Sequence, residues 1–194
     1  MKQKIIASPR QTHELRIIGG QWKRTRLAVL DRPGLRPTPD RVRETVFNWL
    51  GQDLTGWRCV DAFAGSGALG FEAASRGARE VTLVEQDSAL VAQLKRLQTQ
   101  LQAGAIHIVR GDAIAALRQL AQGSQHVIFL DPPFDSVLFG SALQAAGRAV
   151  AADGFVYLEA PHPWTEEQLE SAGLRLHRHL RAGAVHAHLL KPVV

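Results

Sequence analysis

A chain of 194 residues suits a single domain, and folding at this length buries roughly 70% of the unfolded surface. Hydrophobic residues make up 45% of the chain and charged residues 21%, which is typical of a globular protein. The one cysteine, Cys59, excludes an internal disulfide, and no apolar run reaches the roughly 18 residues of a membrane span. The N-terminus also lacks the apolar core of a secretory signal, so we expect a cytoplasmic protein, monomeric and without a membrane partner.

The net charge of +5 is spread unevenly along the chain. Residues 1–50 hold eleven Lys and Arg against four Asp and Glu, whereas the remaining residues hold twelve against fourteen. A basic segment beside a nearly neutral domain is typical of a protein that binds a phosphate backbone. A solvated, charge-rich arm explains the same composition equally well.

The N-terminal part of the chain predicts a basic hairpin followed by a helix. Residues 15–18 and 26–30 flank a Gly-Gly-Gln-Trp-Lys segment, and residues 32–39 form a connector rich in Pro and Gly. Asp40 is expected to cap a helix over residues 41–50, whose apolar residues recur at helical spacing. We therefore divide the chain into an arm, residues 1–35, and a domain, residues 36–194.

After residue 57, short apolar runs alternate with longer helix-like segments, which is the pattern of a doubly wound α/β fold. The apolar runs predict strands at residues 59–63, 80–84, 106–109, 127–130 and 155–159. The segments rich in Ala, Leu and Gln predict helices at residues 69–76, 88–102, 113–121 and 141–150. Residues 174–180 and 185–190 alternate around Ala182-Gly183 and predict an antiparallel hairpin at one edge of the sheet.

A glycine loop follows the first strand of this domain. Gly65, Gly67 and Gly70 satisfy the G-x-G-x-x-G pattern, in which backbone amides at a helix N-terminus can approach a ligand closely. Glu85 ends the next strand 20 residues after Gly65, where a carboxylate can bind ribose hydroxyls. Spacing alone therefore fits a dinucleotide site, and a nicotinamide oxidoreductase is one candidate function.

Two features favour S-adenosylmethionine over a dinucleotide. Asp61 ends the first strand, where a carboxylate would repel a pyrophosphate but suits the cationic amino end of S-adenosylmethionine. The chain is also short for the second nucleotide half and substrate domain of most nicotinamide enzymes. Asp112, just past the third strand, can hold an adenine amine or cap the following helix, and these two roles stay open.

The sequence Asp131-Pro132-Pro133-Phe134 follows an apolar strand at the edge where doubly wound sheets bind ligands. An exocyclic amine on a base is a poor nucleophile because its lone pair is delocalised into the ring. Two acceptors, the Asp131 carboxylate and the Pro132 carbonyl, would orient the lone pair and stabilise the developing positive charge. Phe134 offers a ring on which an extruded base can stack.

The alternative for this motif is a proline-rich turn with its aromatic residue in the core. Its position after the glycine loop and Glu85, on the expected strand, favours amine methylation. The same chemistry serves adenine N6 in DNA or RNA, so an adenine amino-methyltransferase also stays open.

The ordered motifs resemble class I methyltransferases that act on amines, and the N-terminal stretch is similar to the RsmD family. The stretch runs Arg16-Ile-Ile-Gly-Gly-Gln-Trp-Lys23 and then Gly34-Leu-Arg-Pro-Thr-Pro-Asp-Arg-Val-Arg-Glu-Thr-Val-Phe-Asn-Trp-Leu50. The resemblance covers roughly residues 14–160 and implies a mostly parallel seven-stranded sheet with an antiparallel last strand. It also implies methylation of the N2 amine of one guanine in 16S ribosomal RNA, within an assembled or assembling small ribosomal subunit.

By this resemblance, Asp131 and Pro132 hold the amine and Phe134 stacks on the base. S-adenosylmethionine would be held by Thr38, Arg41, Asp61, Phe63, Ala64, Gly65, Ser66, Gly67, Glu85, Gln86, Asp112, Ala113 and Asp131. RNA would be bound by Arg16, Trp22, Lys23, Arg24, Arg26 and Arg36, although Trp22 can equally cover the core of its own hairpin. No metal site is expected, and the four histidines of the tail hairpin are interpreted as structural or surface residues.

Overall fold

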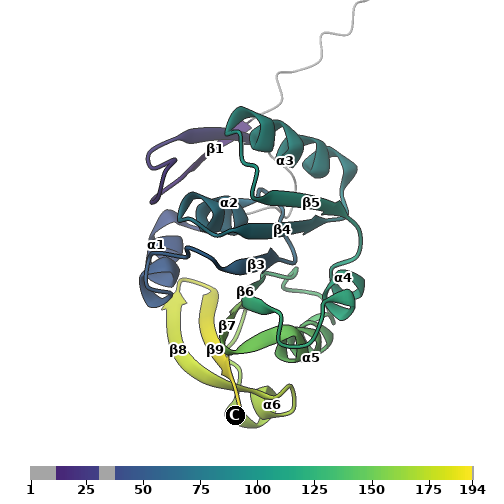
Figure 1. The fold of residues 1–194 in the computed structure, drawn as a ribbon. Helices are drawn as coiled ribbons and strands as arrows, with labels where there is room; N and C mark the ends of the chain where they lie inside the picture. The colour runs from purple at the N-terminus through teal and green to yellow at the C-terminus, as the bar shows by residue number, and fades with distance from the viewer. Residues whose placement is uncertain (1–11, 31–37, 194) are drawn as a thin grey trace, which may run out of the picture.

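The structure, a computed structural model, describes residues 12–30 and 38–193 and contains one seven-stranded sheet with helices on both faces (Figure 1). The strands lie in the order β5-β4-β3-β6-β7-β9-β8. Their bounds are β3 Arg58–Asp61, β4 Glu80–Glu85, β5 Ile106–Arg110, β6 Gln125–Leu130, β7 Val150–Ala160, β8 Leu174–Ala182 and β9 Val185–Pro192. The expected α/β architecture is confirmed.

The central strands of the sheet are parallel, and the last strand of the chain is antiparallel to its neighbours. β3 pairs in parallel with β4 and β6, and the parallel pairing continues to β5 on one side and β7 on the other. β9 is antiparallel to both β7 and β8, so β8 runs parallel to β7 at the edge. This pairing confirms the mostly parallel sheet with an antiparallel last strand. Parallel strands of this kind are stable where helices cover both faces of the sheet, as they do here.

Two groups of helices cover the two faces of the sheet. The helices are α1 Asp40–Trp49, α2 Ala68–Ser75, α3 Ser88–Gln100, α4 Ala113–Gln119, α5 Phe139–Ala149 and α6 Glu166–Glu170. The core of one face includes Phe47, Phe71 and Leu94 from the first three helices, and that of the other includes Leu117 and Leu143 from α4 and α5. Within the described residues, no helix is long and apolar enough to cross a membrane.

The expected cap of α1 is wrong, and α6 was not predicted. Pro39 occupies the N-cap position, whereas Asp40 is the first residue of the helix and its carboxylate binds Arg16 and Arg43. α6 spans only five residues, too few for an apolar period, but Thr165 and Gln168 form a capping box at its start.

The basic hairpin forms from β1 Thr12–Arg16 and β2 Arg26–Leu30. The second strand has its expected bounds, whereas the first ends at Arg16 instead of spanning residues 15–18, and the Ile18 amide donates to the Glu72 carboxylate instead. Its apolar residues, among them Ile17 and Leu27, join the core beneath α1, α2 and α3. Its turn lies against the end of α2, where Gly20 has a φ of +73° and a Cβ would lie 1.8 Å from the Ser75 carbonyl oxygen. The hairpin thus packs directly on the sheet domain, while the division at residue 35 stays a prediction.

A buried carboxylate, that of Glu72 on α2, fastens the hairpin to the sheet domain. It accepts hydrogen bonds from the backbone amides of Ile18 and Gly19 at 2.8 Å and 2.7 Å. It also pairs with Arg76 at 2.9 Å and Arg43 at 3.4 Å. Burial lowers the pKa of Arg43, although the Glu72 and Asp40 carboxylates oppose that shift. A buried ionic network of this kind is costly to break because the partners remain buried.

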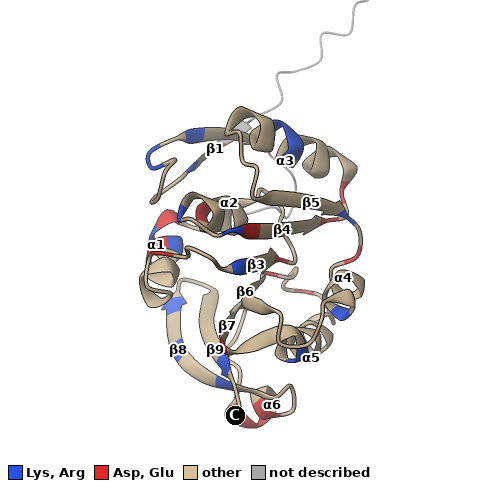
Figure 2. Cartoon of the chain, in the orientation of Figure 1, with Lys and Arg blue, Asp and Glu red and all other residues tan. Residues whose placement is uncertain are grey.

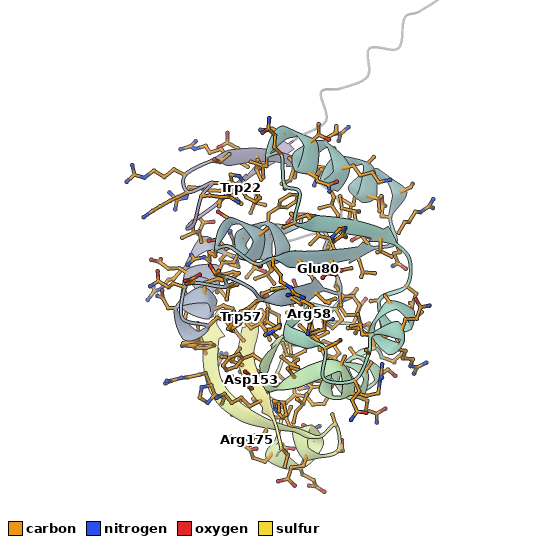
Figure 3. All side chains as sticks on the ribbon, in the orientation of Figure 1. Trp22, Trp57, Arg58, Glu80, Asp153 and Arg175 are labelled. Atoms are coloured by element: carbon orange, nitrogen blue, oxygen red, sulfur yellow. The ribbon has the colours of Figure 1, made fainter. Side chains whose placement is uncertain are left out.

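We expect Glu72→Gln to destabilise the protein by about 3–5 kcal/mol, because two buried guanidinium groups would lose their shared carboxylate. Urea denaturation measures this free energy of unfolding. The matched control is Glu80→Gln, at an exposed position on β4 (Figure 3), which should change stability by less than about 0.5 kcal/mol. Equal stability of the two variants would contradict a structural role for Glu72.

Candidate active site

The candidate site lies where the strand order reverses, between β3 and β6. From β3 the chain builds outward to β4 and β5 on one side, and from β6 to β7 on the other. The loops that leave the carboxyl ends of β3 and β6 therefore lie side by side, at the crevice where doubly wound sheets bind ligands. A hydrogen bond of 3.1 Å from the Ala62 amide to the Phe129 carbonyl ties the two segments together.

The glycine loop has the expected strand–turn–helix form. Gly65 and Gly67 adopt positive φ angles of 51° and 82°, and Gly67 is the N-cap residue of α2. The half-buried carboxylate of Glu85, at the end of β4, accepts the Gly65 amide at 2.9 Å and the Asp87 amide at 2.8 Å. Glu85 therefore braces the loop from the neighbouring strand.

Packing explains two of the three glycines of the G-x-G-x-x-G pattern. A Cβ on Gly67 would lie 2.6 Å from Phe71 and 2.7 Å from Leu94. A Cβ on Gly70 would lie 2.0 Å from Leu83 of the sheet. Gly70 therefore lets α2 approach the sheet closely, and Gly67 leaves space for Phe71 of α2 and Leu94 of α3, so the pattern does not require a pyrophosphate.

Asp61, the last residue of β3, is 2% exposed, and its Oδ2 accepts a hydrogen bond of 3.0 Å from the Gly70 amide. Burial raises its pKa to about 7, the Gly70 amide lowers it, and the nearby Glu85 and Glu159 carboxylates raise it further. The side chain thus holds the first turn of α2 in place at the edge of the site.

Asp131 follows β6 directly, at the centre of the crevice. No hydrogen bond or ion pair to its carboxylate exists within the described segments, 12–30 and 38–193. Burial raises its pKa well above the ordinary value, and the Glu159 and Asp61 carboxylates add to that shift. Pro132 is buried, whereas Phe134 is 38% exposed and so remains accessible to a partner. The motif therefore presents an unpaired carboxylate beside an accessible ring.

Sequence reasoning missed Glu159, which lies in β7 beside β6 and is 3% exposed. Its Oε1 accepts hydrogen bonds from the Thr38 hydroxyl at 2.8 Å and the Tyr157 hydroxyl at 2.9 Å. Burial raises the pKa of Glu159, and these two hydroxyl donors partly offset the shift. A signal was present, since an acidic residue near the end of an apolar strand repeats the placement of Asp61 and Asp131.

The three carboxylates of Asp61, Asp131 and Glu159 come from the adjacent strands β3, β6 and β7. No Lys or Arg forms an ion pair with any of them among the described residues. Buried like charges raise one another's pKa, and a bound cation would favour their ionised forms. The site therefore fits a positively charged ligand and disfavours a pyrophosphate.

The other residues that were expected to bind the cofactor differ in how deeply they are buried. Thr38 is buried and reaches the site through Glu159, whereas Arg41 is exposed on α1. Asp112 is exposed and caps α4 by accepting the Ala115 amide at 2.8 Å, so a contact to adenine stays a prediction. The remaining neighbours are Phe63 (half-buried), Ala64, Ser66 and Ala113 (buried), and Gln86 (exposed).

The expected RNA-binding residues lie mainly on the hairpin β1–β2, apart from Arg36, which falls outside the described residues. Arg16 pairs with Asp40 at 2.9 Å and Arg26 pairs with Glu14 at 3.0 Å, so both cations have acidic partners. Lys23 and Arg24 are exposed at the turn. The ring of Trp22 is half-buried against the core (Figure 3), so it covers its own hairpin, and RNA contact by this group stays a prediction.

The histidines of the tail do not assemble a metal centre in the part of the chain that the structure describes. The buried ring of His188 accepts the Trp164 amide at 3.3 Å, and its pKa falls to about 4, chiefly because of burial. His179 and His186 hydrogen-bond to each other at 3.0 Å.

The sheet order and the two loops at the switch point define the fold of class I methyltransferases. The solved structure of the putative methyltransferase yhhF from Escherichia coli superposes with a TM-score of 0.80 and 36% identity, covering 93% of this chain and 98% of that one.

The chain belongs to the family described as Conserved hypothetical protein 95, whose model matches residues 15–191, and this is the RsmD family that its motifs resemble. It is 42% identical over 177 residues to Ribosomal RNA small subunit methyltransferase D of Escherichia coli K12, covering 89% of this chain and 87% of that protein. The protein of the same name from Haemophilus influenzae is 38% identical over 189 residues, covering 90% of this chain and 97% of that protein.

We expect Asp61→Asn to change how stability depends on pH, because the folded pKa of about 7 lies above the unfolded value of about 3.9. Between these values the unfolded chain is ionised and the folded chain is not, so wild-type stability falls as pH rises. Asparagine keeps an acceptor for Gly70 and removes this loss, so the variant should gain up to about 4 kcal/mol relative to wild type from pH 4 to pH 8.

Urea denaturation at several pH values in the absence of ligand measures this difference. The control is Asp153→Asn, which removes an exposed carboxyl group at the start of β7 (Figure 3) and leaves the Asp61 contact to Gly70 intact. A pH-independent difference for Asp61→Asn would show that Asp61 is not buried in this way.

Proposed function

We propose that this protein is an S-adenosylmethionine-dependent methyltransferase that methylates the N2 amine of a guanine in 16S ribosomal RNA. The observation that carries the proposal is the unpaired Asp131 carboxylate, raised in pKa, next to Pro132 at the switch point of the sheet. The names of the relatives from two bacteria favour ribosomal RNA as the substrate. Guanine N2 is the amine that the RsmD resemblance implies.

The cofactor site is proposed from the charge of the residues at the switch point of the sheet. When bound, S-adenosylmethionine supplies a methyl group on a positively charged sulfonium. Asp61, Asp131 and Glu159 provide a negative potential without cationic partners among the described residues, which suits that charge. Glu85 lies where ribose hydroxyls can bind, beside the glycine loop whose Gly65 amide donates a hydrogen bond to it.

The chemistry of the reacting amine falls to Asp131 and Pro132. Their carboxylate and carbonyl oxygens accept the two hydrogens of the amine, so its lone pair points toward the methyl donor. As the N–CH₃ bond forms and the S–CH₃ bond breaks, positive charge develops on nitrogen and the Asp131 carboxylate stabilises it. The methylated amine then loses a proton, to the Asp131 carboxylate or to water.

The loop after Asp131 is suited to hold the base. Phe134 is 38% exposed and Val137 is 95% exposed, so both apolar side chains are accessible to a partner. Both lie within six residues of Asp131. A base extruded from the RNA can stack on the Phe134 ring, which typically contributes about 1–3 kcal/mol.

Two other functions are less well supported. An adenine amino-methyltransferase would use the same two acceptors, so the names of the relatives, rather than the site geometry, favour ribosomal RNA. A nicotinamide oxidoreductase would place a pyrophosphate near three buried carboxylates, where repulsion disfavours it. We further propose that the protein acts in the cytoplasm as a monomer, on an assembled or assembling small subunit.

We expect Asp131→Asn to lower kcat by about 10²–10³-fold, because it removes the charge that stabilises the transition state. The KM for RNA should change little, since phosphate contacts elsewhere supply most of the affinity. Methyl transfer to small ribosomal subunits, with the product nucleoside identified by mass spectrometry, measures both constants.

The matched control is Asp135→Asn, on the same loop and exposed, which should leave kcat within about twofold of wild type. Full activity of Asp131→Asn would rule out the proposed role of this carboxylate, whereas equal loss in both variants would point to a general disturbance of the loop.

A further inference from the structure

The C-terminal hairpin formed by β8 and β9, here named the edge hairpin, is strongly basic. Residues 171–194 contain three Arg, one Lys and no Asp or Glu. The near-neutral sum over residues 51–194 conceals this, because the fourteen acidic residues of that stretch all precede residue 171. Blue segments mark the edge hairpin in Figure 2, away from the hairpin β1–β2. The molecule therefore carries a second basic surface that the charge count over residues 1–50 and 51–194 does not reveal.

The arginines of the edge hairpin lack acidic partners. Arg175, Arg178 and Arg181 are exposed, and none forms an ion pair within the described residues. Arg181 donates a hydrogen bond of 3.2 Å to the Gly183 carbonyl. By contrast, the arginines that form ion pairs within residues 12–30 and 38–193 all lie in the first half of the chain, namely Arg16, Arg26, Arg43 and Arg76. Exposed guanidinium groups without internal partners remain available for an external anion.

The strand register places this charge at the active-site edge of the sheet. Ala160 at the end of β7 pairs with His186 of β9, which pairs in turn with Arg181 of β8. Arg181 therefore lies in the row next to that of Glu159, at the carboxyl edge that holds the site. From there the cations follow β8 along the outer edge to Arg175, which pairs with Lys191 and is labelled in Figure 3. The basic edge thus leads directly away from the proposed catalytic crevice.

Two imidazole rings, one exposed (His179) and one half-buried (His186), adjoin Arg181. His179 and His186 stack with ring centroids 5.2 Å apart and an interplanar angle of 13°. Their mutual hydrogen bond of 3.0 Å requires that one ring nitrogen accept, so at least one of the rings is neutral. Partial desolvation lowers the pKa of His186, and the positive charges of His179 and Arg181 lower it further. The pair presents flat rings beside a fixed cation, a combination suited to unpaired bases and their phosphates.

We propose that the edge hairpin docks the phosphate backbone of the substrate RNA, with Arg175, Arg178 and Arg181 as its main contacts. This inference rests on the proposed function, because it takes RNA as the substrate. Charge complementarity and continuity with the active-site edge carry it. The competing explanation is that cations on an edge strand prevent pairing with other sheets, which predicts a change in self-association rather than in RNA binding.

The test replaces all three arginines with Gln and measures binding to a 16S RNA transcript and to small ribosomal subunits that lack the methyl group. The control replaces three other exposed arginines with Gln and so changes the net charge by the same amount. They are Arg79, which immediately precedes β4, Arg96 on α3 and Arg118 on α4. We expect the edge variant to bind RNA at least about 10-fold more weakly and to lose about 2–3 from the salt slope, one for each phosphate contact. The control should bind as wild type does.

A second readout is the kinetics of methyl transfer. The edge variant should raise the KM for subunits while kcat and S-adenosylmethionine affinity stay within about twofold of wild type. Unchanged RNA affinity and salt slope would overturn the proposal, as would a variant that only self-associates or a wild-type protein that binds no RNA.

The two proposals fail separately. Loss of RNA affinity in a protein that methylates no guanine would keep the docking surface and refute the proposed function. Guanine methylation with an unaffected edge variant would do the opposite.

Discussion

The parallel pairing of β3 with both β4 and β6 is the constraint on which the rest of the site depends. The chain adds β4 and β5 on one side of β3, and β7 on the far side of β6. The loops after β3 and β6, which are distant in sequence, therefore leave the sheet side by side. The glycine loop after β3 and the Asp131 loop after β6 would otherwise not meet. β7 then adds Glu159 from the next strand, so one sheet edge gathers three carboxylates.

The same gathering of charge works against stability. Burial of Asp61, Asp131 and Glu159 raises all three pKa values, and each ionisation in the absence of a cation costs free energy. Strain of this kind is characteristic of functional sites. The buried Glu72 network has the opposite character, since its charges are paired and join the N-terminal hairpin to α2. Among the described residues, the molecule thus separates an ion-paired structural network from three carboxylates without ion pairs at the proposed site.

Local patterns predicted the strands, most helix limits and the two loops, because apolar periodicity and turn residues report on nearby structure. They failed where the partner is distant in sequence. Asp40 read as a cap, but its carboxylate pairs with Arg16 and Arg43. Glu159 carries a weak local signal, its place near the end of an apolar strand, but its hydrogen bond from Thr38, 121 residues away, emerges only in the fold. The basic edge hairpin was not predicted, because charge was summed over residues 1–50 and 51–194 rather than over single helices and strands.

The most direct test of the central claim is transfer of a labelled methyl group from S-adenosylmethionine to three substrates: unmethylated small ribosomal subunits, free 16S RNA and DNA. Digestion and mass spectrometry then identify the modified nucleoside. The account predicts N2-methylguanosine, formed mainly in subunits. Label in N6-methyladenine, or only in DNA, would contradict the assignment of guanine in ribosomal RNA, and no label in any substrate would contradict the enzyme itself.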